Sequence, residues 1–159
     1  MSLAAPADLA LAFRFDVEVD GNKLGSWTTC KGLSVRFKHQ MVKELGQHEY
    51  ISYIPGYAEF PKVTLQRAMQ KDDWAKTRSW LNDVARASWM TGEVSLADSG
   101  ASGGTGAKVT LRDGHGEEVA SWTLSNAMPI GWKGPALDAN SKKVALETLE
   151  LVHEGFLDG

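Results

Sequence analysis

Apolar and polar residues alternate through the first part of the chain, from residue 11 to residue 19. Phe13, Phe15 and Val17 fall on one side of this pattern, and Arg14 and Asp16 fall on the other. Side chains of a β-strand point to opposite faces at every second residue, so the pattern predicts a half-buried strand. A turn signal follows at residues 20–21, and we expect residues 23–33 to return as the second strand of a hairpin, with a break or bulge at residue 32.

Residues 33–43 alternate again, with most apolar side chains at odd positions and polar side chains at even positions. Residues 45–47 can form a tip, and residues 49–54 can return as the partner strand. We therefore predict an extended β-hairpin over about residues 34–54, whose odd face packs into its own subunit and whose even face is wet. Pro55-Gly56 is expected to close this unit before a further strand at residues 62–67.

Helical periodicity appears once, over about residues 72–89, where two aspartates suit the N-terminal end. Trp74, Leu81 and Trp89 fall on one stripe, with Trp80 and Val84 on its flank. This apolar arc is broader than one sheet face requires. Two interpretations stay open: the helix is deeply buried, or its flank meets another subunit.

Four further strands are expected at residues 93–97, 108–112, 117–124 and 144–153. Residues 129–135 read as a turn cluster around Trp132, which either covers the core or anchors a neighbouring chain. The pattern predicts one mainly β domain over residues 1–159: a small antiparallel β-barrel or sandwich with about nine strands and one flanking helix. Residues 1–9 are expected to form a loosely ordered N-terminal arm.

The amino-acid composition restricts the classes of function that the chain can have. The chain has 159 residues, 43% hydrophobic and 23% charged, as in an ordinary globular domain, and no apolar run approaches the length of a membrane span. Pro6 and Asp8 interrupt the apolar start, so no secretion signal is expected. Cys30 is the single cysteine, which fits a protein made in a reducing cytoplasm. The net charge of −3 disfavours nucleic-acid binding as the primary activity, although a charged channel through which nucleic acid passes stays possible.

Candidate reaction chemistry is sparse. The glycine-rich residues 100–106 lack the lysine and hydroxyl spacing of a phosphate loop, and a strand rather than a helix follows them. His115 lies between Asp113 and Glu117, but in a glycine-flanked turn where nothing would desolvate a ligand. We therefore predict no catalytic residue, no metal site and no cofactor.

Several segments, in this order and spacing, carry a family resemblance that runs nearly from end to end. They are residues 15–21, 24–25, 30–33, 55–56, 61–67, 72–80, 126–132 and 144–155. In these segments the chain resembles the tail-tube proteins of contractile phages and the inner tube proteins of bacterial contractile injection systems. Ala68 stands where that family usually has a glycine.

The resemblance implies a structural subunit. Hexameric rings of such subunits stack into a rigid hollow tube, and their strands join into a continuous lumenal barrel. The implied partners are other copies of the chain, a contractile sheath protein, baseplate or hub and tube-terminator proteins, and a protein or DNA payload that moves passively through the lumen. No membrane contact is implied in the resting state. Assembly would occur in the bacterial cytoplasm, and the product would be a phage tail or an injection particle.

Two residue sets follow as expectations. The proposed lumen-facing residues are Ser34, Arg36, Lys38, Gln40, Lys62, Thr64 and Gln66, with an ordinary solvent face as the alternative. The proposed inter-subunit or inter-ring residues are Leu45, Gly46, Gln47, His48, Trp80, Val84 and Trp132. Two other functions stay open: a tube-initiating or baseplate-adaptor paralogue of the same fold, and a soluble ligand-binding β-barrel.

Overall fold

The computed structural model describes residues 13–46, 48–86, 106–136, 138–140 and 143–157. Within these ranges the chain forms ten strands and one α-helix. In chain order they are β1 (Arg14–Val19), β2 (Asn22–Trp27), β3 (Thr29–Lys31), β4 (Arg36–Val42), β5 (Ser52–Glu59), β6 (Val63–Ala68), α1 (Lys71–Val84), β7 (Ala107–Arg112), β8 (Glu118–Leu124), β9 (Met128–Lys133) and β10 (Leu146–Val152). No helix in these ranges is long and apolar enough to cross a membrane.

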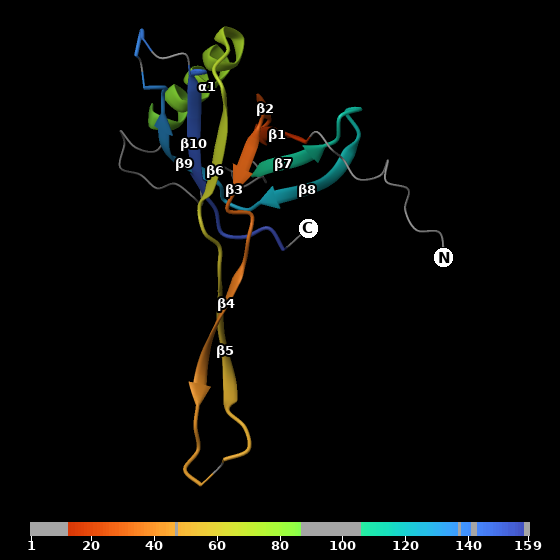
Figure 1. The fold of residues 1–159 in the computed structure, drawn as a ribbon, viewed down its shortest axis with the longest axis vertical. Helices are drawn as coiled ribbons and strands as arrows, with labels where there is room; N and C mark the ends of the chain where they lie inside the picture. Colours follow the sequence, from red (N-terminus) through yellow and green to blue (C-terminus); the bar gives the residue numbers. More distant parts are fainter. Residues whose placement is uncertain (1–12, 47, 87–105, 137, 141–142, 158–159) are drawn as a thin grey trace, which may run out of the picture.

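Eight of the strands form two four-stranded antiparallel sheets, with the orders β2-β1-β7-β8 and β3-β6-β10-β9. The chain passes from the first sheet to the second twice, between β2 and β3 at Thr28 and between β8 and β9 at residues 125–127. The sheets enclose one apolar core between them (Figure 1). This arrangement confirms the predicted antiparallel barrel or sandwich with a flanking helix.

The core is built from the inward positions of both sheets. Val17 and Val19 of β1 are buried in the first sheet, as the alternation of the first strand predicts. Val63, Leu65 and Leu149 are completely buried in the second sheet. Each such side chain contributes about 1.5–3 kcal/mol on burial, so the regular alternation holds the two layers together.

Strands β4 and β5 form a long hairpin that projects away from the two sheets (Figure 1). Within the described residues they pair only with each other, and they continue the ribbon of β3 and β6 beyond the body of the protein. The predicted end at Pro55-Gly56 is wrong, because β5 runs through these residues to Glu59. The register shifts between Phe37 and His39, and this bulge lets the ribbon accept a proline and a glycine.

The helix α1 begins at Lys71, with Asp72 and Asp73 in its first turn as expected. It buries Thr77 and Trp80 against the body of the protein. Residues 87–89, the expected strand at 93–97, the expected arm at 1–9 and most of the glycine-rich segment at 100–106 lie outside the described residues.

Residues 129–133 are not a turn cluster, so that prediction is wrong. They belong to β9, which pairs with β10, Leu149 lying opposite Trp132. Pro129 is tolerated because β9 ends the strand order of its sheet and because the register shifts next to it, between Glu150 and Leu151. Trp132 is therefore held by sheet pairing rather than by a loop.

Candidate assembly surfaces

The hairpin exposes one face that is predominantly apolar and aromatic. The pairs Phe37 with Ala58, His39 with Pro55 and Met41 with Tyr53 lie on this side, which we name the apolar hairpin face. Phe37 is 65% exposed, Met41 64% and Tyr53 59%. The prediction that this odd face packs into its own subunit is wrong, because the hairpin leaves the body before any sheet can cover it.

The opposite side of the hairpin is mainly polar, and we name it the polar hairpin face. Arg36 lies opposite Glu59, and Lys38 forms an ion pair with Glu59 at 2.9 Å. The pKa of the Glu59 carboxyl is lowered, chiefly by its hydrogen bond and charge interaction with Lys38. Gln40 continues this side opposite Ile54, an apolar exception that is 50% exposed. Ser34, just before β4, is exposed as well.

A second polar surface covers the outer side of the sheet β3-β6-β10-β9. Its members alternate with buried core residues along each strand and meet through cross-strand pairing. We define this polar sheet face by Thr29, Lys31, Lys62, Thr64, Gln66, Lys133, Thr148 and Glu150. Lys62 forms an ion pair with Glu150 at 3.1 Å, and the Gln66 amide donates to Thr148 at 3.4 Å. The structure thus brings Lys62, Thr64 and Gln66 together on one side, as the alternation of β6 predicts.

The hairpin tip is fully exposed to solvent. Leu45 has no neighbour that shields it, and Gly46 adopts a φ of +91° in the turn. His48 is exposed beside it, whereas Gln47 lies outside the described residues. The three described tip residues are therefore accessible to another subunit.

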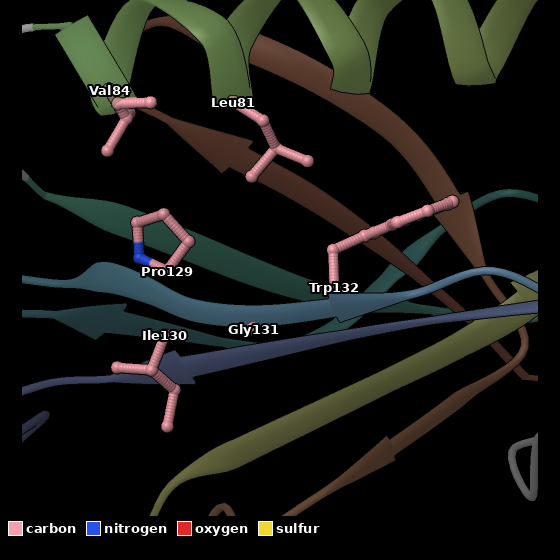
Figure 2. A pocket seen from close by; sticks show the side chains of 7 residues that line it. Leu81, Val84, Pro129, Ile130, Gly131 and Trp132 are labelled. Carbon is pink, nitrogen blue, oxygen red and sulfur yellow. The ribbon is translucent and has the colours of Figure 1, made fainter. Parts of the chain in front are cut away.

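A shallow apolar groove separates α1 from β9, with a volume of about 180 Å³. Leu81 and Val84 point from the helix toward Pro129 and Trp132 on the strand (Figure 2). Ile130 lines the groove too and is 45% exposed. Val84, one of the predicted contact residues, therefore borders a surface that another chain can reach.

The alternatives of burial in the core and contact with another subunit have different outcomes for Trp80 and Trp132. Trp80 is only 4% exposed and belongs to the core, so it has almost no surface to offer to a partner and leaves the candidate set. Trp132 is half-buried and stacks on Trp74 with ring centroids 4.4 Å apart. It packs against the core and also lines the groove.

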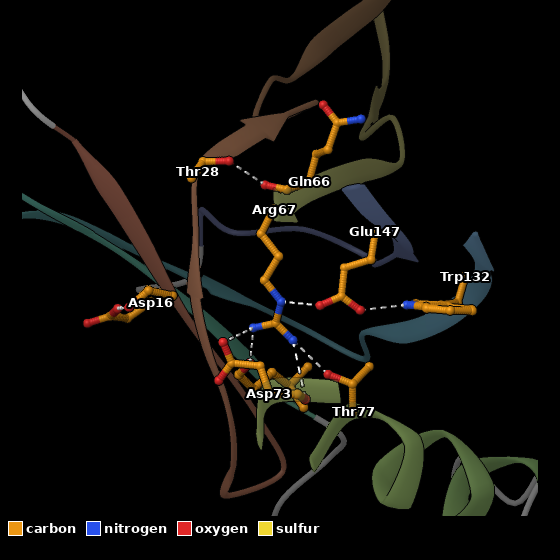
Figure 3. Close-up of polar contacts among 10 residues, drawn as sticks. Asp16, Thr28, Gln66, Arg67, Asp73, Thr77, Trp132 and Glu147 are labelled. Atoms are coloured by element: carbon orange, nitrogen blue, oxygen red, sulfur yellow. Dashed lines mark hydrogen bonds and ion pairs between the residues drawn. The ribbon is translucent and has the colours of Figure 1, made fainter. Parts of the chain in front are cut away.

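A buried charged cluster lies between α1 and the strands β6 and β10 (Figure 3). Arg67 of β6 donates from Nε to Glu147 of β10, and from Nη2 to the Thr77 hydroxyl of α1 at 2.8 Å. Its guanidinium carbon lies 3.9 Å from the centre of the Trp27 ring, and the Trp132 indole donates to the second Glu147 oxygen at 3.1 Å. This cluster joins α1 to both sheets and sets the position of the helix beside β9.

Sequence reasoning missed this cluster. The available signal was parity: Arg67 follows Val63 and Leu65 at inward positions of one strand, and Glu147 precedes Leu149 at an inward position of another. Charges of opposite sign on facing inward positions indicate a buried pair, because an isolated charge is rarely buried.

Reactive groups are not assembled in the described ranges. No cluster of three or more histidine, cysteine, aspartate or glutamate side chains suits a metal ion there. Burial raises the pKa of the Cys30 thiol to about 11, which keeps it protonated and unreactive at neutral pH. His115 is exposed in its turn, where the Asp113 carboxylate accepts from the backbone amides of residues 115 and 117 at 2.9 Å each.

Taken together, these surfaces define a β-rich assembly subunit, with an uncovered apolar hairpin and no assembled reaction centre in the described residues. A family model described as the T4-like virus tail tube protein gp19 matches residues 11–157. The chain belongs to this tail tube family and is a structural tube subunit.

Solved structures share the fold at low sequence identity. A chain of the six-fold symmetrised cryo-EM structure of the anti-feeding prophage baseplate is 20% identical, with a TM-score of 0.69 over 98% of this chain and 95% of that one. A chain of the extended sheath–tube complex of the extracellular contractile injection system PVC is 17% identical, with a TM-score of 0.69 over 98% and 96%. A type six secretion system protein is 10% identical, with a TM-score of 0.55 over 89% and 80%. No curated protein sequence matches the chain significantly.

Proposed function

We propose that six copies of this chain close into a ring and that the rings stack into the inner tube of a contractile injection machine. The observation that carries this proposal is the apolar hairpin face, which its own subunit leaves uncovered. Full burial of a large apolar side chain is worth about 1.5–3 kcal/mol, so covering Phe37, Met41 and Tyr53 on a neighbour would stabilise a ring by several kcal/mol per subunit.

Ring closure also uses the strand edges. Both edges of the projecting hairpin and the outer edge of β9 carry backbone groups that can pair with another copy. Open edges invite uncontrolled association, whereas in a closed ring an edge of each subunit pairs with a different edge of the next subunit. A six-fold relative of the same fold supports six as the number of copies.

The polar hairpin face and the polar sheet face would then line the lumen. With the apolar hairpin face turned to a neighbouring subunit, Arg36, Lys38 and Gln40 point away from that contact. The outer side of β6, with Thr64 and Gln66, would extend the same wettable wall. The hairpin tip and the α1–β9 groove, with Val84 and Trp132, would provide contacts between subunits or between rings.

The same proposal assigns partners and location. A sheath protein would surround the tube, baseplate and terminator proteins would end it, and a payload would pass through it without chemical change. Relatives of the same fold occur in sheath–tube, baseplate and terminator complexes, which supports these partners. The chain would be no enzyme, and it would assemble in the bacterial cytoplasm into a phage tail or injection particle. A baseplate adaptor with the same fold would form single rings instead.

Opposite faces of the hairpin provide a matched test. Met41→Glu places a charge on the apolar hairpin face, and Gln40→Glu places the same charge on the polar face one residue away. Negative-stain microscopy of both purified variants and the wild type should show stacked rings for the wild type and Gln40→Glu, and monomers for Met41→Glu. Tubes of equal length from all three proteins would refute the hairpin as the ring contact, and single capped wild-type rings would favour the adaptor.

Labelling tests the lumen assignment. A cysteine at Arg36 or Lys38 should react with small thiol reagents in assembled tubes but be protected from reagents too large to enter the lumen. Equal labelling of tubes and free subunits by the large reagent would place these residues outside. Deleting residues 45–48 tests the tip, and long tubes from that variant would exclude a role between rings.

A further inference from the structure

The two polar faces carry a charge opposite in sign to that of the whole chain. Their cationic side chains are Lys31, Arg36, Lys38, Lys62 and Lys133, and their carboxylates are Glu59 and Glu150. The excess is three positive charges. Because the chain carries −3 in total, all its other residues together carry −6.

The positive charge on these faces is neutralised only in part. Glu59 and Glu150 each pair with one lysine, at 2.9 and 3.1 Å. Lys31 and Lys133 are exposed and form no ion pair within the described residues. Between them lie threonine and glutamine side chains, which offer further hydrogen-bond donors to a passing carboxylate.

We infer that this wall favours a protein payload whose surface is acidic. The inference rests on the proposed lumen assignment and adds the chemical class of the payload to it. A ring of six subunits would present a positive wall inside, while the remaining charge of −6 per subunit is spread over all its other residues. Fields of one sign in an enclosed channel concentrate molecules of the opposite sign.

Nucleic acid fits this wall less well. DNA carries one negative charge per about 1.7 Å and would contact many cations in every ring, which binds it tightly and retards its exit. Proteins that hold single strands also use aromatic stacking platforms, whereas the polar sheet face carries threonines and glutamine. Dispersed carboxylates on a folded protein give weaker, reversible contacts that permit both loading and release.

The test uses assembled tubes and fluorescent probes of equal length: a glutamate-rich peptide, a lysine-rich peptide and a single-stranded oligonucleotide. Tubes are sedimented at low and high salt, and the retained probe is measured. We expect about tenfold more acidic than basic peptide at low salt, with the preference lost at high salt because screening shortens the electrostatic range.

Substitutions of the two lysines without an ion pair test whether the preference for the acidic peptide arises on the polar sheet face. The pair Lys31→Glu and Lys133→Glu changes the excess on the wall from three positive charges to one negative charge and should reverse the preference. The milder pair Lys31→Gln and Lys133→Gln leaves one positive charge in excess and should weaken the preference, and it keeps the test available if the reversed wall impairs assembly. Lys108→Glu, an exposed position on β7 of the other sheet, is the matched control and should leave retention unchanged.

Two kinds of failure are separable because microscopy of the same samples reports assembly. Absence of wild-type tubes would contradict the ring proposal. Intact tubes that retain both peptides equally, or that respond equally to Lys108→Glu, would overturn the acidic-payload inference alone. Stronger retention of the oligonucleotide than of the acidic peptide would replace it with a nucleic-acid payload.

Discussion

Removing one member of the buried Arg67–Glu147 pair should destabilise the fold far more than removing a surface pair between the same two strands. Arg67 is 2% exposed and Glu147 is completely buried. In Glu147→Ala the guanidinium keeps the Thr77 hydroxyl and the Leu24 carbonyl as acceptors and the Asp73 carboxylate at 3.8 Å, but it loses its fully buried carboxylate partner. The Trp132 indole loses its acceptor in the same variant.

Breaking a buried ion pair from one side costs about 3–5 kcal/mol, because the charge left behind lies in a poorly solvated site. The partly exposed Asp73 carboxylate, 3.8 Å from Arg67 Nη1, compensates only part of that charge. The free energy of unfolding of a domain is about 5–15 kcal/mol, so this loss is a large share of the total stability. Removing both charges, in Arg67→Met with Glu147→Leu, should cost less than Glu147→Ala alone, since the only carboxylate that loses a partner is that of Asp73, which is 22% exposed to solvent.

The matched control is Glu150→Ala, which removes the partner of Lys62 on the polar side of the same strands. A pair of this exposed kind contributes less than about 1 kcal/mol. The wild type and the three variants are unfolded in urea at protein concentrations too low for tube assembly. Circular dichroism and tryptophan fluorescence then give the free energy of unfolding of each. A loss for Glu147→Ala no larger than that for Glu150→Ala would refute the role of the buried cluster.

Three further predictions concern a backbone position, a thiol and a histidine. Gly32→Ala should cost more than about 2 kcal/mol, because φ is +96° and the new Cβ would lie 2.0 Å from the Lys62 carbonyl oxygen; Gly21→Ala, at φ +77° in open space, should cost less. Cys30, with a pKa raised to about 11, should react with a disulfide reagent at pH 8 at least about 100-fold more slowly than in the unfolded chain. Burial lowers the pKa of His153, so the unfolded chain binds the proton first and the free energy of unfolding should fall as pH drops below about 6.5. A His153→Asn variant with the same pH slope would contradict that assignment.

The sequence predicted correctly those elements that are marked by a pattern of only a few neighbouring residues. The alternation around Val17 and Val19 marks β1, and the aspartates before Trp74 mark the start of α1. The hairpin was predicted as well, but with its return strand too short, because Pro55-Gly56 is normally a terminator. In a ribbon free on both edges, a bulge accommodates these residues.

The features missed depend on contacts between distant segments. Strand β9 contains a proline and a glycine that locally favour a turn, and only its pairing with β10 makes it extended. The Arg67–Glu147 pair joins residues 80 positions apart. The position of each charge in phase with buried residues of its own strand hints at burial, but only the pairing of β6 with β10 shows that the two charges face each other. The position of the α1–β9 groove therefore depends on long-range pairing, and the local periodicity of the sequence cannot predict it.

The apolar hairpin face shows why the sequence pattern alone placed these residues on the wrong surface. Alternation specifies that Phe37, Met41 and Tyr53 share a side, but it does not specify which chain covers that side. In an isolated domain the covering surface must be the domain's own core. Here the core is already filled by the two sheets, and the hairpin extends beyond them. An amphipathic ribbon that its own domain cannot cover is expected of a subunit whose folding is completed by a neighbour.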